Sequence, residues 1–184
     1  MKVAKQYLPY ILLAASLTTL AIIRVAHGSV SAAVQRQADL EAIGRVLEQY
    51  RATEDAGDMN AQGKLMAPDR VWVSQFAAGR RTDNIENMRI QQAQTDRRKK
   101  AIPGLQQFSE DREKLIKFYG DGKVAVASFY RYSTRLFPPG TSAELMQEYV
   151  AGKELISLVL EKRGNDWLIV HTHVSDIGLK ESAT

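Results

Sequence analysis

The stretch from Gly120 to Phe137, GDGKVAVASFYRYSTRLF, decides the fold class of this chain. It begins with a Gly-Asp-Gly turn, and the residues that follow are mostly apolar, aromatic or β-branched, as in a β-strand. Since successive residues of a strand point to opposite faces, Val124 and Tyr130 share one face. Phe129 and Arg131 share the other face. An Asp-Gly pair between two such runs is a strong hairpin signal, so we predict a long antiparallel hairpin.

The hairpin is part of a longer meander of strands. The sequence predicts strands over residues 105–119 and 123–137, a Pro-Pro-Gly loop, and then strands over residues 144–162, with a bulge at Gly152, and 167–175. Residues 70–76 form an earlier predicted strand, followed by a turn at residues 77–81. In this strand Trp72 and Val73 point to opposite faces.

Helices precede and interrupt these strands. The spacing of apolar residues predicts a helix over residues 38–56, a short one over 58–67 and a third over 84–100. Asp58 and Asp83 are the predicted N-caps of the second and third helices. Helices collected on one side of an antiparallel sheet make an α+β domain. We expect a cone-shaped, curved antiparallel sheet with about three N-terminal helices over its concave face, and a ligand pocket inside the cone.

The composition fits one globular domain and excludes several classes of protein. The chain has 184 residues, of which 45% are hydrophobic and 25% charged, and it has no cysteine. Disulfides, thiolate metal sites and cysteine nucleophiles are therefore excluded. The net charge is +4, but without Lys2, Lys5 and Arg24 the count is 22 basic against 21 acidic residues. The positive balance belongs mostly to the N-terminal segment, so nucleic-acid binding is not expected.

Residues 1–33 have the layout of an export signal. Lys2 and Lys5 precede an apolar run over residues 7–23, and small residues suited to cleavage follow that run. An uncleaved membrane anchor is the alternative, since the run is at the lower limit for crossing a bilayer. Both interpretations place the predicted domain, residues 38–178, outside the cytoplasm, either periplasmic or secreted, or anchored and facing away from the cytoplasm.

Two local strings and the order of elements resemble the nuclear transport factor 2-like superfamily, and in particular its SnoaL-like domains. The first string is YRATEDAGD, which starts at Tyr50, followed later by APDRVWV. The second is DWLIVHTHVS, which starts at Asp166 and is similar to the closing strand of SnoaL-like domains and of the calcium/calmodulin-dependent kinase II association domain. The resemblance covers about residues 40–177. It implies the cone fold but no activity, since the superfamily mixes enzymes, binding proteins and assembly modules.

The resemblance extends to ketosteroid isomerases, which belong to the same superfamily. Tyr50 matches the isomerase tyrosine that donates a hydrogen bond to the substrate oxyanion. The isomerase base is an aspartate, and the matching stretch here, Trp72-Val73-Ser74-Gln75, has no carboxylate. Such an isomerase needs both a base and a donor. Steroid isomerisation is therefore not expected, and Tyr50 has a second interpretation as a core residue.

His171 and His173 lie two residues apart on the predicted closing strand. Alternation places both on one face together with Trp167 and Ile169. If this face points into the cone, the imidazoles can act as acid/base groups or ligand contacts. The alternative is a structural pair, hydrogen-bonded to neighbouring strands. The remaining histidine, His27, lies in the leader, so the ligand count does not support a metal site, and we expect no metal or cofactor.

Arg131 and Arg135 lie on the strand face opposite the tyrosines of the hairpin. They are candidates for holding an anionic ligand if this face is concave. The other interpretation is an exposed strand face with carboxylate partners across the sheet.

These observations lead to one expectation and two alternatives. We expect a protein that binds a small, largely apolar molecule in the cone, without assigned catalysis. The candidate ligand contacts are Tyr50, Trp72, Trp167, His171 and His173. One alternative is a cyclase, isomerase or hydratase that uses Tyr50 and the two histidines. The other is an assembly module of an exported complex. A homodimer through the convex sheet face is expected, because helices can cover only one side of the sheet.

Overall fold

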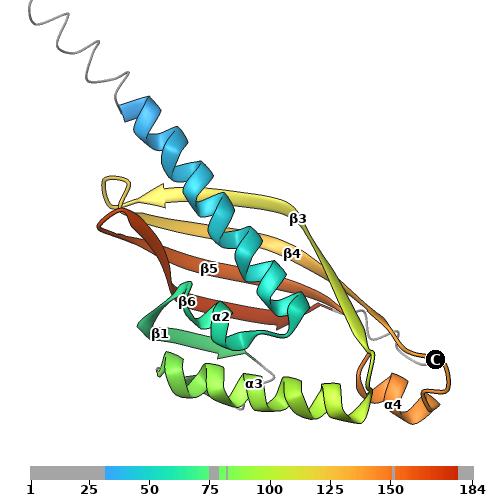
Figure 1. The fold of residues 1–184 in the computed structure, drawn as a ribbon. Coiled ribbons are helices and arrows are strands. Elements are labelled where there is room, and N and C mark those ends of the chain that lie inside the picture. Colours follow the sequence, from blue (N-terminus) through green and yellow to red (C-terminus); the bar gives the residue numbers. More distant parts are fainter. Residues whose placement is uncertain (1–31, 75–78, 82, 151, 178–184) are drawn as a thin grey trace, which may run out of the picture. The chain divides into compact units, whose positions relative to one another are not determined.

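The computed structural model describes residues 32–74, 79–81, 83–150 and 152–177 (Figure 1). The chain divides into two compact units, residues 1–41 and 42–184. In the first unit, residues 32–41 are helical, so the helix predicted to begin at residue 38 begins earlier. The predicted export signal or anchor lies almost entirely in residues 1–31, outside the described residues. No helix among the described residues is long and apolar enough to cross a membrane.

The second unit is built on a curved six-stranded sheet in the order β2-β1-β6-β5-β4-β3. Its strands are β1 (Met66–Ser74), β2 (Gly79–Arg81), β3 (Gln106–Tyr119), β4 (Val124–Leu136), β5 (Lys153–Arg163) and β6 (Asp166–Asp176). The predicted α+β class is confirmed, and so is the hairpin of β3 and β4, whose turn uses positive φ angles at Gly120, Asp121 and Gly122. One pair departs from the antiparallel pattern, because β1 runs parallel to β6. Residues 79–81, predicted as a turn, pair with β1 instead.

The helices of the second unit are residues 42–56, α2 (Met59–Gly63), α3 (Asn84–Ala101) and α4 (Ala143–Glu148). The two predicted N-caps are confirmed, since the side chain of Asp58 accepts from the Ala61 amide and that of Asp83 from the Glu86 amide. The strand predicted over residues 144–162 is wrong in its first half. Ser142 caps α4 there, and the helix buries none of its side chains, so no core contact holds this segment in a strand. The bulge predicted at Gly152 is also wrong, because this residue precedes β5.

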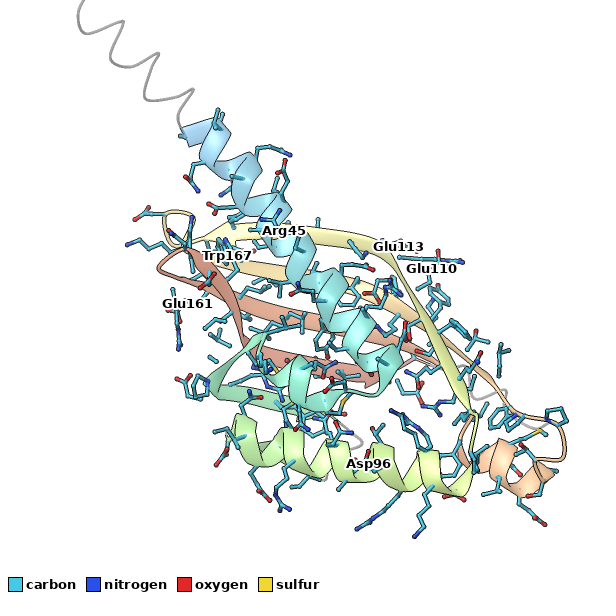
Figure 2. All side chains as sticks on the ribbon, in the orientation of Figure 1. Arg45, Asp96, Glu110, Glu113, Glu161 and Trp167 are labelled. Carbon is cyan, nitrogen blue, oxygen red and sulfur yellow. The ribbon has the colours of Figure 1, made fainter. Side chains whose placement is uncertain are left out.

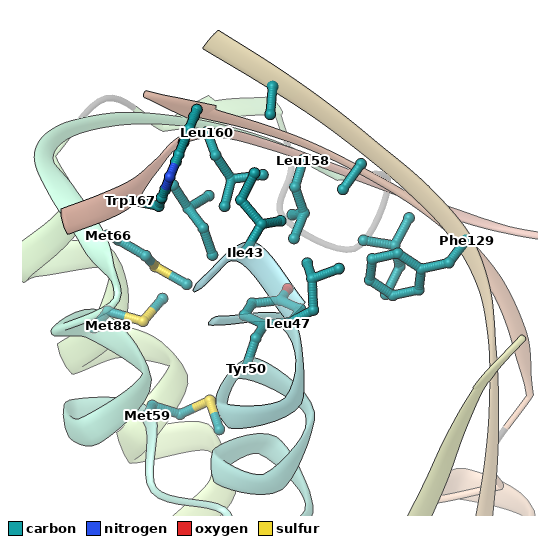
Figure 3. Close-up of a cluster of buried hydrophobic side chains, with 14 residues drawn as sticks. Ile43, Leu47, Tyr50, Met59, Met66, Met88, Phe129, Leu158, Leu160 and Trp167 are labelled. Atoms are coloured by element: carbon teal, nitrogen blue, oxygen red, sulfur yellow. The ribbon is translucent and has the colours of Figure 1, made fainter. Parts of the chain in front are cut away.

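The core lies between the concave face of the sheet and the helices (Figure 3). Ile43, Leu47 and Tyr50 form the buried stripe of the helix over residues 42–56. They pack in one cluster with alternate residues of the sheet, namely Ala125, Ala127, Phe129, Ile156, Leu158, Leu160, Trp167 and Ile169. Each fully buried large side chain of this kind contributes about 1.5–3 kcal/mol relative to an exposed one.

A β-bulge in β6 changes which residues face the core. Consecutive residues of β5 pair with Ile169 and His171, so Val170 is left without a partner. Ile169 and Thr172 are therefore both fully buried, whereas His171 is half-buried and His173 exposed. The prediction that the two histidines share the face of Ile169 is wrong. One inserted residue reverses the alternation beyond it and directs both imidazoles to the convex side.

Candidate functional site

Arg131 of β4 is the centre of a buried polar cluster on the concave face. Its guanidinium is fully buried, and its Nε and Nη2 donate to the two carboxylate oxygens of Asp111 at 2.7 and 2.9 Å. Its Nη1 donates to Glu54 at 2.8 Å. One edge of the guanidinium therefore holds one carboxylate in a bidentate pair, the strongest arrangement that arginine offers. Burial alone would lower the pKa of Arg131, but Glu54 and Asp111 raise it above its usual value.

Tyr50 packs against this cluster. The guanidinium carbon of Arg131 lies 5.0 Å from the centroid of the Tyr50 ring and 5.6 Å from that of Phe129, within the range of cation–π attraction. Burial raises the pKa of the Tyr50 hydroxyl, and the negative charge of Glu54 raises it further. The phenol is therefore neutral and belongs to the core, as one of the two interpretations of this residue predicted.

The first sequence string supplies most of the contacts between the helix and this cluster. Arg51 Nη1 donates to Asp55 at 3.1 Å and to the Ser109 carbonyl of β3 at 3.0 Å. Asp55 in turn accepts from the Ser109 amide at 3.1 Å. Together with Tyr50 and Glu54, these residues connect the end of the helix to β3 and β4. The string YRATEDAGD therefore encodes the contact between the helix and the sheet.

Arg70 of β1 is a second buried arginine with different surroundings. Only 2% of the residue is exposed, and its Nη1 donates to Thr172 Oγ1 at 3.0 Å. Its Nε and Nη2 are buried and have no hydrogen-bond partner among the described residues. Burial lowers the pKa of Arg70 to about 10. This guanidinium therefore remains charged at neutral pH, with two donors unsatisfied.

Glu154 of β5 is a carboxyl group with a strongly altered pKa on the same face of the sheet. It lies directly opposite Asp176 of β6 in the strand register. Burial raises the pKa of Glu154 to about 7, with a further contribution from Glu54, while Arg131 opposes the shift. Glu154 therefore loses its proton near neutral pH.

The structure separates the residues that the sequence proposed as one site. Tyr50 and Trp167 are buried in the core, where Trp167 packs edge-on against Phe118 at 5.8 Å. Trp167 belongs to the β5–β6 turn end of the sheet (Figure 2). His171 and His173 lie on the opposite face of the sheet, where His173 Nε2 is 3.1 Å from Ser175 Oγ. Tyr50 and the two histidines therefore do not form a common constellation.

Trp72 is half-buried. Arg70 precedes it by two residues in β1, so the two side chains share one face of the strand. This alternation was visible in the sequence and could have placed Arg70 on the core side. Arg131 pairs across the sheet with Asp111, as one interpretation predicted, but it lies fully buried on the concave face and not on an exposed one. The roles of Glu54, Arg70, Asp111, Glu154 and Thr172 were not predicted.

Comparison with known proteins identifies the fold. No family model and no curated protein matches the sequence. Among solved structures, the chain is similar to a nuclear transport factor 2-like protein with a cystatin-like fold from Novosphingobium aromaticivorans, at a TM-score of 0.62 and 18% identity over 84% of this chain and 90% of the other. It is also similar to a protein from Catenulispora acidiphila in complex with S-DNPA, at a TM-score of 0.59 and 14% identity over 76% and 94%.

A third similar structure is a nuclear transport factor 2-like protein of unknown function from Pseudomonas putida, with a TM-score of 0.57 and 15% identity over 76% of this chain and 86% of the other. At these low identities, the similarity shows that the chains share a fold. This chain therefore has the nuclear transport factor 2-like fold, as the resemblance of its sequence predicted.

Proposed function

We propose that this protein binds a small molecule on the concave side of its sheet, beside Arg70, without an assigned catalytic step. The observation that carries the proposal is the pair of buried donors on Arg70, Nε and Nη2, that no described residue satisfies. Buried donors in native proteins nearly always have an acceptor, because an unsatisfied one costs about 1–3 kcal/mol. A bound molecule with an acceptor group supplies this partner.

The arrangement of the other candidates supports binding over acid/base catalysis. A proton-transferring site needs a base within reach of the bound molecule. Both histidines of the closing strand lie on the convex side, and the described part of the isomerase-like base stretch, Trp72 to Ser74, has no carboxylate. Glu154, the concave carboxyl that titrates near neutral pH, lies opposite Arg131 in the strand register and not beside Arg70. We therefore assign the concave face a binding role.

The first prediction tests this role with the full chain. Protein purified under native conditions is expected to carry a small molecule that dissociates on unfolding and is detected by mass spectrometry. Adding it back in excess should raise the unfolding free energy, by about 2.7 kcal/mol at 100 times its Kd. The variant Arg70→Met should purify without the molecule, whereas the surface variant Arg163→Met should retain it. Purification of the wild type and Arg70→Met with the same content would contradict the proposal.

We also propose that two copies associate through the convex face of the sheet. Four apolar or aromatic residues on the outer strands are each 52–54% exposed, namely Phe108, Leu115 and Tyr119 of β3 and Leu136 of β4. The strand register places all four on the face opposite the core. Clustered apolar side chains of this kind mark interaction surfaces more often than isolated ones do.

The second prediction concerns this association. Sedimentation at micromolar concentration is expected to show a dimer for the wild type and a monomer for Leu115→Glu, because a charge in the apolar centre of an interface must be desolvated. The matched control is Ile85→Glu on α3, which changes a residue of similar type with 76% exposure away from the sheet. Its sedimentation should equal that of the wild type. A monomeric wild type would contradict the proposal.

A further inference from the structure

We propose that Arg70 holds a carboxylate, so that the molecule bound on the concave face is a small carboxylic acid with an apolar body. This inference rests on the proposed function and specifies the chemical class of the ligand. Arg70 and Arg131 are both buried and lie on the same face of the same sheet.

Arg131 shows how this protein satisfies a buried guanidinium. Its Nε and Nη2, which form one edge of the group, donate to both oxygens of the Asp111 carboxylate. Its Nη1 is used by a different neighbour, Glu54. Arg70 repeats half of this pattern. Its Nη1 is used by Thr172, and the unsatisfied atoms are again Nε and Nη2. The open edge of Arg70 is therefore the edge to which Arg131 binds a carboxylate.

The number of donors agrees with a carboxylate. Nε and Nη2 carry one N–H each along this edge, and a carboxylate presents two oxygens at matching separation. A ligand with one carboxylate therefore fits the observed set of unsatisfied atoms.

The charge around Arg70 leads to the same class of ligand. Burial lowers the pKa of Arg70, and among the described residues Tyr50 is the one side chain that opposes this shift. No carboxylate of the described residues forms an ion pair or a hydrogen bond with Arg70. A neutral acceptor would satisfy its hydrogen bonds but leave a buried charge uncompensated, which is strongly unfavourable. An anion satisfies both requirements.

The side chains near Thr172 indicate the chemistry of the remainder of the ligand. Thr172, the partner of Arg70, lies directly opposite Leu158 in the register of β5 and β6. Leu158 and the adjacent core residues Ile156 and Ile169 are fully buried and apolar. These hydrocarbon side chains favour an apolar body on a molecule that places its carboxylate on Arg70.

The experiment compares carboxylates with their uncharged amides on the full chain. Acetate, butyrate and benzoate are titrated against acetamide, butyramide and benzamide at constant ionic strength, by calorimetry and by the ¹⁵N resonance of Arg70 Nε. We expect at least one acid to bind wild type at least about tenfold more tightly than its amide and to shift the Arg70 resonance. Arg70→Lys keeps the charge but loses the paired edge, so it should bind that acid at least about tenfold more weakly than wild type.

The variants separate the possible outcomes. Arg70→Met should lose the preference for the acid while its ligand-free midpoint of thermal unfolding stays equal or rises, because an uncompensated charge has been removed. A lower midpoint would show that a protein group already compensates Arg70 and would overturn the inference. Equal binding of acid and amide, lost in Arg70→Met, would overturn the carboxylate and leave the proposed function intact. If neither series binds, the carboxylate inference fails, and the proposed function is decided by the molecule that purifies with the protein.

Discussion

Replacing Arg131 by methionine is expected to lower the free energy of unfolding by about 3–5 kcal/mol at pH 7, the usual loss when one partner of a buried ion pair is removed. Methionine fills part of the space of the arginine side chain, so the loss arises mainly from charge. Asp111 is 1% exposed in its side chain and forms its bidentate pair with Arg131. Without the guanidinium this carboxylate must stay charged and unpaired in the core or take up a proton.

Urea denaturation of wild type and Arg131→Met at pH 7 measures this loss. Arg163→Met is the matched control, because Arg163 also pairs with two carboxylates, those of Glu161 and Asp69, but is 42% exposed. Exposed ion pairs contribute about 0–1 kcal/mol, so this variant should stay close to wild type. A loss below about 1 kcal/mol in Arg131→Met would contradict the interpretation that Arg131 and Asp111 form a buried ion pair.

Stability is expected to fall as the pH rises from about 5 to 8, and Glu154→Gln is expected to remove most of this dependence. The pKa of Glu154 is about 7 in the folded protein, mainly because of burial, whereas a carboxyl group of an unfolded chain titrates near 4.3. Below the lower value the group is protonated in both states and has no effect. Above about pH 7 the folded state must bury a charge, and the cost approaches an upper limit of about 4 kcal/mol.

The measurement is urea denaturation of wild type and variant at several pH values between 5 and 8. The two proteins should be similar at pH 5, and the variant should be more stable at pH 8. The control is Glu161→Gln in the same strand, since Glu161 is 43% exposed in its side chain and pairs with Arg163 at the surface. Its pH dependence should equal that of the wild type. Parallel curves for wild type and Glu154→Gln would contradict the expected titration of this residue.

The features that could be predicted from the sequence depend on neighbours along the chain. The alternation in β4 placed Phe129 and Arg131 on one face, because residues two apart in a strand share a face, and the structure shows that this is the core face. The caps at Asp58 and Asp83 were predicted because a carboxylate accepts from an amide three residues later whatever surrounds the helix.

The candidate site could be predicted only in part. Arg131 and Tyr50 were identified from their strand face and their helical stripe, respectively. Arg70 was not identified, although it shares a strand face with Trp72, because an arginine in a strand is usually assigned to the surface. The histidines were assigned to the wrong face because the alternation was extended through the whole closing strand. The residue that actually faces the core there is Thr172.

The sequence by itself determined most of the succession of helices and strands, with α4 and β2 as the exceptions, the tight turn between β3 and β4, and the alternation of faces along β4, since each follows from the conformation of a few consecutive residues. Only the tertiary structure decided the parallel pairing of β1 with β6 and the bulge at Val170, which depend on strands far apart in the chain. These two features bring Thr172 against Arg70 and place His171 and His173 on the other side of the sheet. The partners of a buried charge are determined by strand register across the sheet, and one inserted residue is enough to change them.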